Sequence, residues 1–134
     1  MKDVKVSGIM HRDLISLSPD VSIRDAIDMM ASQHIGSIFI QAGELKECGI
    51  ITERDVLNIV AKSIDLSEPV STVMSKDLIY VGPEDNLLEV FTMMIDNLIR
   101  HAPIKDENDK VISILSLRAI CQTFRTHIAS GDFT

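Results

Sequence analysis

Apolar and polar positions follow the same order twice along this chain. Each copy begins with a short extended run that ends at a proline, Pro19 in the first copy and Pro83 in the second. An apolar stripe at helical spacing follows, then two strand-like apolar runs around a polar loop, then a second helical segment. The strand-like runs cover 37–41, 48–52, 102–105 and 111–116, and the closing helices cover 53–63 and 117–127. This order predicts β-α-β-β-α in each copy.

The first helix of each copy has a candidate N-terminal cap. Ser22 precedes one stripe with Asp25 three residues on, and Asn86 precedes the other with Glu89 three residues on. The side chains expected to face the core are Ile23, Ala26, Ile27 and Met30 in one helix, and Leu87, Val90, Phe91, Met94, Ile95 and Leu98 in the other. The spacing of both stripes is typical of helices that cover one face of a sheet.

Identical residues recur at a constant offset of 64, the distance from Met10 to Met74. The same offset relates Arg54 to Arg118 and the "DLI" at residue 13 to the "DLI" at residue 77. The chain is therefore two copies of a unit of about 60 residues, the size of a small domain.

The duplication predicts the fold class and its boundaries. A sheet of three strands with two helices covers one face of the sheet well, and two such units can bury both faces by packing together. We therefore expect an α+β fold of two β-α-β-β-α repeats, packed with pseudo-twofold symmetry through their sheets. The expected segments are repeat 1 at 4–63, a linker at 64–69, repeat 2 at 70–128 and a C-terminal tail at 129–134.

Composition and charge exclude several classes of protein. The net charge of −7 argues against a nucleic-acid backbone as partner, and no apolar run approaches the roughly 20 residues of a membrane span. Cys48 and Cys121 lie far apart in apolar surroundings, which predicts buried free thiols and a cytoplasmic protein. The histidines and cysteines have no metal-ligand spacing, so we expect no metal.

The stretch "GIITERD", which ends at Asp55, has two interpretations. Thr52 and Asp55 have the spacing of a capping box at a helix start. A hydroxyl and a carboxylate at the end of a strand can also bind the hydroxyls of a ribose. The second copy has "SILSLRA" here, which keeps a hydroxyl at Ser116 but replaces the acid with Ala119.

These motifs resemble those of a tandem pair of CBS domains, the family named after cystathionine β-synthase. The resemblance rests on the openings "VSGIM" and "VSTVM", on helices that carry Met-Met, and on "GIITERD". It implies a regulatory module that binds AMP, ADP, ATP, S-adenosylmethionine or NAD between its repeats. It also implies a homodimer and an unidentified protein target.

The resemblance also assigns roles to individual residues. It places Thr52 and Asp55 at the ribose hydroxyls, and it makes Arg100 and His101 of the other repeat candidate phosphate ligands. Further candidate contacts of the ligand are Arg54, Ile50 and Pro103, the last two against an adenine face. We expect one adenine nucleotide, AMP, ADP or ATP, in this cleft.

The second cleft would combine Ser116 and Ala119 with Gly36 and Ser37, without a carboxylate or a basic pair. The sequence thus predicts one competent site per chain.

The residues and the resemblance favour one function and leave two alternatives. The favoured one is a sensor of an adenosine-containing nucleotide that signals to a partner protein. The alternatives are a dimeric interaction scaffold that needs no ligand, and a module for S-adenosylmethionine or NAD. The chain has no P-loop, no GxGxxG fingerprint and no catalytic triad pattern, so we expect no enzyme activity.

Overall fold

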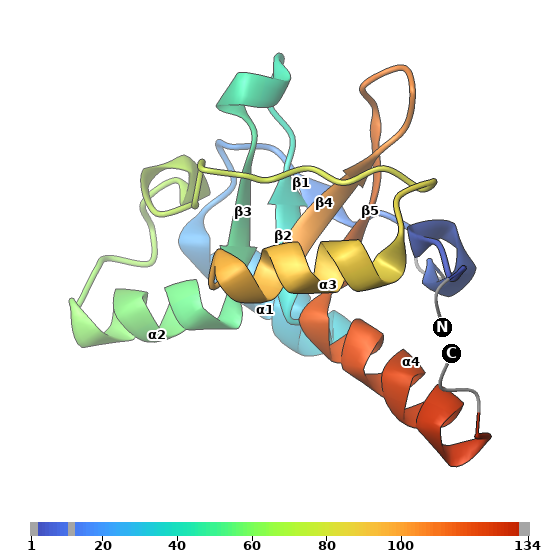
Figure 1. The fold of residues 1–134 in the computed structure, drawn as a ribbon. Coiled ribbons are helices and arrows are strands. Elements are labelled where there is room, and N and C mark those ends of the chain that lie inside the picture. The colour runs from blue at the N-terminus through green and yellow to red at the C-terminus, as the bar shows by residue number, and fades with distance from the viewer. Residues whose placement is uncertain (1–2, 11–12, 132–134) are drawn as a thin grey trace. The chain divides into compact units, whose positions relative to one another are not determined.

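The computed structural model describes residues 3–10 and 13–131 (Figure 1). Its helices are α1 (Ile23–Gln33), α2 (Glu53–Ala61), α3 (Leu87–Asp96) and α4 (Leu117–Ala129), and its strands are β1 (Ser16–Leu17), β2 (Ser37–Ile40), β3 (Gly49–Thr52), β4 (His101–Lys105) and β5 (Val111–Ser116). Three short 3-10 turns are η1 (Val6–Ile9), η2 (Leu45–Glu47) and η3 (Val70–Thr72). The order of helices and strands confirms the predicted mixed fold of two similar repeats.

The chain forms two compact units that are offset from the repeats. The central unit is Ile15–Leu78, and the terminal unit combines Met1–Leu14 with Ile79–Thr134. Each unit thus consists of most of one repeat and the opening segment of the other.

Backbone hydrogen bonds show how the opening segments are exchanged. In the terminal unit the Leu87 N–H at the start of α3 donates to the Val4 carbonyl oxygen at 2.8 Å. In the central unit the Ile23 N–H at the start of α1 donates to the Glu68 carbonyl oxygen at 2.9 Å. The two donors, Leu87 and Ile23, are 64 residues apart in sequence, and so are the two acceptors, Val4 and Glu68. The duplicated sequence therefore makes the same contact twice.

The predicted linker 64–69 is held within the central unit. The Arg24 N–H donates to the Leu66 carbonyl oxygen at 3.0 Å. The Ser67 N–H and hydroxyl donate to the Asp65 carboxylate at 2.9 and 2.8 Å, and these bonds lower the pKa of Asp65. The predicted tail starts inside α4, which continues to Ala129, and its last residues, 132–134, lie outside the described residues.

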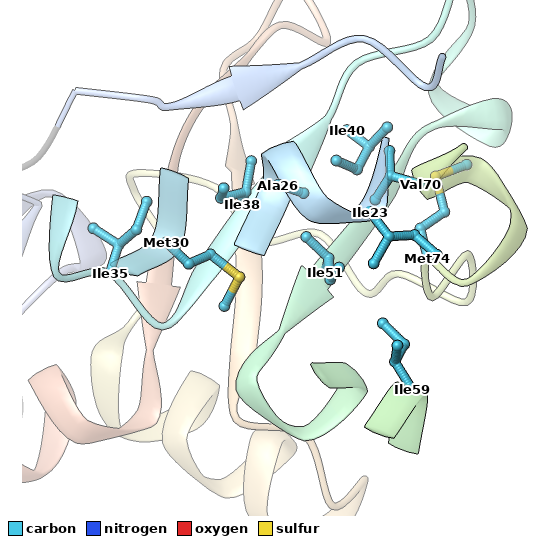
Figure 2. Close-up of a cluster of buried hydrophobic side chains, with 10 residues drawn as sticks. All are labelled: Ile23, Ala26, Met30, Ile35, Ile38, Ile40, Ile51, Ile59, Val70 and Met74. Atoms are coloured by element: carbon cyan, nitrogen blue, oxygen red, sulfur yellow. The ribbon is translucent and has the colours of Figure 1, made fainter. Parts of the chain in front are cut away.

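In the central unit, β2 pairs with β1 in parallel and with β3 in antiparallel orientation. Ile38, Phe39 and Ile40 are all fully buried, and successive side chains point to opposite faces of a strand, so both faces of β2 are buried. The buried side chains of one core cluster come from α1, the turn after it, β2, β3, α2 and the segment around η3 (Figure 2). They are Ile23, Ala26, Met30, Ile35, Ile38, Ile40, Ile51, Ile59, Val70 and Met74. The opening segment of the second repeat therefore supplies part of the core of the first.

The terminal unit has an antiparallel hairpin, β4–β5, and no full counterpart of β1 among the described residues. Its first strand is reduced to a parallel bridge between Val81 and Ile104. In the central unit the Phe39 N–H donates to the Ile15 carbonyl oxygen at 3.3 Å, and the residue that corresponds to Phe39 is Pro103. Because proline has no N–H, this bond cannot form and the strand shortens.

Both predicted caps of the first helices are confirmed. The Ser22 hydroxyl accepts from the Asp25 N–H at 3.1 Å, and the Asn86 side-chain oxygen accepts from the Glu89 N–H at 3.0 Å. These bonds satisfy donors that the first turn of a helix leaves free.

Three burial predictions were wrong. Ile95 and Leu98 are 46% and 85% exposed, because the buried stripe of α3 is Leu87, Val90 and Met94 and the helix ends at Asp96. Leu98 follows that end with a left-handed φ of 56°. Cys121 is exposed on α4, one position past the buried Ile120, whereas Cys48 is buried as expected.

Candidate functional site

The junction between β3 and α2 brings together the predicted ribose residues. Thr52 is the last residue of β3 and the N-cap of α2. Its hydroxyl accepts from the Asp55 N–H at 3.4 Å, and Asp55 Oδ2 accepts from the Thr52 N–H at 2.8 Å. The capping box is therefore complete, and the structural interpretation of "GIITERD" is confirmed.

The two carboxylate oxygens of Asp55 have different partners. Oδ2 accepts from the Thr52 N–H and also from the Thr52 hydroxyl, at 3.1 Å. Oδ1 accepts from the Ser75 hydroxyl at 3.3 Å. A carboxylate oxygen can accept about two hydrogen bonds, so Oδ1 retains acceptor capacity. Asp55 is half-buried, and the bonds from Thr52 go to Oδ2, so a further bond to Oδ1 would leave the cap intact.

Backbone pairing holds Ser75 beside the junction. Ile50 N–H donates to the Ser75 carbonyl oxygen at 3.0 Å, and Ser75 N–H donates to the Ile50 carbonyl oxygen at 2.9 Å. Gly49 permits this approach, because a Cβ there would lie 2.5 Å from Met74 Sδ and 3.0 Å from the Ser75 carbonyl oxygen. Sequence reasoning missed Ser75. Its one signal is that it directly follows the "VSTVM" opening.

The other candidates of the central unit lie around this junction. Ile50 is 5% exposed, and both its backbone groups bond to Ser75, so it supports the junction from within. Arg54 is exposed in the first turn of α2. Glu53 and Asp55 make that first turn acidic.

The terminal unit has the corresponding junction between β5 and α4. The Ser116 hydroxyl accepts from the Ala119 N–H at 3.1 Å, so the cap remains although the acid is absent. No acidic residue occurs in the first turn of α4. The two junctions therefore share their backbone form and differ in charge, as the sequence predicted.

Arg100, His101 and Pro103 belong to the terminal unit, whereas Thr52 and Asp55 belong to the central unit. The Arg100 carbonyl oxygen accepts from the Leu117 N–H at 2.8 Å, and His101 is the cross-strand partner of Ser116. The equivalent bond of the central unit runs from the Glu53 N–H to the Gly36 carbonyl oxygen at 3.1 Å. Arg100 is exposed, His101 is half-buried and Pro103 is buried within β4.

Within residues 3–10 and 13–131, no three His, Cys, Asp or Glu side chains are grouped so that they could hold a metal ion. No helix in the same part of the chain has the length and hydropathy to cross a membrane.

The chain belongs to the CBS domain family. The family profile matches residues 6–62 and again residues 70–125, one match within each predicted repeat. This match confirms the resemblance and the tandem arrangement.

Curated relatives include short proteins and parts of longer ones. The chain is 33% identical over 129 residues to the CBS domain-containing protein YhcV of Bacillus subtilis, covering 95% of this chain and 90% of YhcV. It is 31% identical over 118 residues to an uncharacterized 17.7 kDa protein of Acidianus ambivalens, covering 88% and 71%. It is 32% identical over 128 residues to an inosine-5′-monophosphate dehydrogenase of Methanocaldococcus jannaschii, covering 96% of this chain but 25% of the enzyme.

Solved structures confirm the fold. A CBS domain protein from Pyrobaculum aerophilum complexed with AMP matches with a TM-score of 0.82 at 24% identity, covering 95% of this chain and 99% of the other. The CBS domain pair of protein MJ0100, in complex with 5′-methylthioadenosine and S-adenosyl-L-methionine, matches with a TM-score of 0.82 at 21% identity, covering 92% and 97%.

Proposed function

We propose that this CBS pair is a regulatory module that binds one adenosine-containing ligand per chain, with AMP, ADP or ATP favoured over S-adenosylmethionine or NAD. The observation that carries the proposal is the half-buried Asp55 carboxylate, whose Oδ1 retains acceptor capacity while Oδ2 completes the cap. AMP and S-adenosyl-L-methionine in the two similar structures support the ligand class.

The chemistry of the junction suits ribose. A carboxylate accepts strongly from hydroxyl groups, and the capping box fixes the direction in which the Asp55 carboxylate points. The junction of the terminal unit has Ala119 at this position and no such acceptor. This difference supports binding of one ligand per chain.

The remaining assignments are carried by the family resemblance. Arg100 and His101 are proposed to bind the phosphate of the ligand, Ile50 and Pro103 to line its base, and Arg54 to add positive charge near it. We further propose that the module acts in the cytoplasm as a homodimer without catalysing a reaction. A partner protein would read the ligand-induced change, which is limited by the difference in affinity between the two states.

Isothermal titration with AMP tests the proposal. The wild-type chain is expected to bind one AMP per chain, and Asp55→Ala to lower the affinity about 10- to 100-fold, since hydrogen bonds to a charged group are strong. Asp55→Asn keeps an acceptor for the cap and removes the charge, so it separates loss of ligand contact from loss of the helix start.

Asp25→Ala is the matched control, because Asp25 is also an acid in the first turn of a helix in the central unit. Its affinity for AMP should equal that of the wild type. Two equivalent sites per chain, or unchanged affinity in both Asp55 variants, would contradict the assignment. A wild-type chain that binds no adenosyl compound would favour the scaffold function instead.

A further inference from the structure

We infer that Ser75 is a specificity-determining residue of this site, where its hydroxyl accepts from one of the two ribose hydroxyls while Asp55 accepts from the other. The inference rests on the proposed function and extends it. Ser75 lies 20 positions from Asp55 in sequence, and its Oγ lies 3.3 Å from Asp55 Oδ1.

The number of hydrogen bonds that Asp55 can accept is the reason for assigning one ribose hydroxyl to Ser75. A ribose brings two neighbouring O–H donors. Asp55 Oδ2 already accepts two bonds from Thr52, and Oδ1 accepts one from Ser75. The Thr52 hydroxyl is used by the cap in both directions, since it donates to Oδ2 and accepts from the Asp55 N–H. Of these two residues, the carboxylate thus offers one free position, on Oδ1, to two incoming donors. A serine hydroxyl that donates its proton still has two acceptor lone pairs, so the Ser75 oxygen can take the second donor beside the carboxylate.

The position of Ser75 suits this role. Its backbone is fixed to Ile50 by bonds of 3.0 and 2.9 Å, and its side chain is exposed, so a ligand can reach the hydroxyl. Donation to a carboxylate also makes the serine oxygen a better acceptor, because linked hydrogen bonds polarise one another.

The second copy lacks the same set of residues. Positions 64 residues away from Thr52, Asp55 and Ser75 are Ser116, Ala119 and residue 11, a histidine that lies outside the described residues. The group of two hydroxyls around a carboxylate is thus a feature of one copy in the sequence.

The test compares AMP, 2′-deoxy-AMP and 3′-deoxy-AMP by titration into the wild type and Ser75→Ala. The variant should bind AMP about 3- to 10-fold more weakly, the value of one neutral hydrogen bond. One of the two deoxy compounds retains the hydroxyl that Ser75 binds, and Ser75→Ala should lose the same factor in affinity for that compound. For the other deoxy compound, which lacks that hydroxyl, the variant and the wild type should bind with equal affinity. Ser75→Thr keeps the hydroxyl and should bind AMP within about twofold of the wild type.

Two results would overturn the inference. An equal loss with all three compounds would mean that Ser75 merely orients Asp55, and no loss with any of them would mean that it has no role. Either result leaves the proposed function standing if the wild type binds AMP, whereas a wild type that binds none of the compounds overturns both. Ser32→Ala, which removes a hydroxyl bonded to the Met29 carbonyl oxygen of its own helix, is the control and should not change any affinity.

Discussion

Gly49 packs closely against Met74 and Ser75, beside the candidate site. A Cβ at this position would lie 2.5 Å from Met74 Sδ and 2.6 Å from Met74 Cγ. The methionine side chain can move, but the Ser75 carbonyl oxygen at 3.0 Å is backbone and is paired with Ile50. Gly49→Ala is therefore expected to lower the free energy of unfolding by about 1–3 kcal/mol, as overpacking does, measured by urea denaturation.

Gly43→Ala is the matched control for this change. Gly43 lies in the same unit, and a Cβ there would have no neighbour within 4 Å. Its free energy of unfolding should match that of the wild type within about 0.5 kcal/mol or rise slightly, because alanine restricts the unfolded chain. Equal stability of both variants would mean that residues 74–75 move aside freely.

Residue-level predictions succeeded where the cause is local. The caps at Ser22 and Asn86 and the box at Thr52 depend on residues three positions apart, which a sequence displays directly. Ser75 was missed because its bond to Asp55 depends on the pairing of two distant segments. The ribose role of Asp55 stays a prediction from the family resemblance.

At the scale of elements, periodicity predicted the helices and most strands to within a few residues. The segment around Val81 was expected to match β1 but forms a single bridge to Ile104. The reason is that Pro103 of β4 has no backbone N–H to donate to this segment. Ile95 and Leu98 were assigned to the core because the apolar run of α3 continues past the point where the helix ends, at Asp96. Asn97, the C-cap, is the one sequence signal of that end, and the apolar pattern that continues to Leu98 obscures it.

The start of α4 offers a test of the capping box as an element. Ser116 already accepts from the Ala119 N–H, but no carboxylate bonds back to the N-cap residue. Ala119→Asp should supply that bond, as Asp55 does in α2, and place a negative charge at the positive end of the helix. We expect a gain of about 0.5–1 kcal/mol in the free energy of unfolding at neutral pH, measured by urea denaturation.

Ala129→Asp is the control for helix charge. Ala129 is the exposed last residue of α4, where a carboxylate opposes the helix dipole. This variant should be no more stable than the wild type. A stability of Ala119→Asp at or below that of the wild type would contradict the view that both junctions use the same cap.

At the scale of the whole molecule, duplication and exchange explain why repeats and compact units differ. The two copies make corresponding bonds, such as Leu87 N–H to the Val4 carbonyl oxygen and Ile23 N–H to the Glu68 carbonyl oxygen. Each copy therefore completes the unit of the other, so neither repeat is expected to fold alone. The offset of 64 was visible in the sequence, but nothing in it indicated which copy receives each opening segment.

The proposed homodimer can be tested at the exposed face of α2, which carries two large apolar side chains. Leu57 and Val60 are 70% and 68% exposed, and residues three apart lie on the same face of a helix. Burial of such side chains favours association, so the wild type should elute at twice the chain mass of 14.9 kDa in chromatography with light scattering.

Leu57→Glu should shift the mass toward the monomer, because a buried carboxylate without a partner is costly. Asn58→Glu adds the same charge at the next position, off that face, and should remain dimeric. A Leu57→Glu variant with the wild-type mass would place the dimer contact elsewhere.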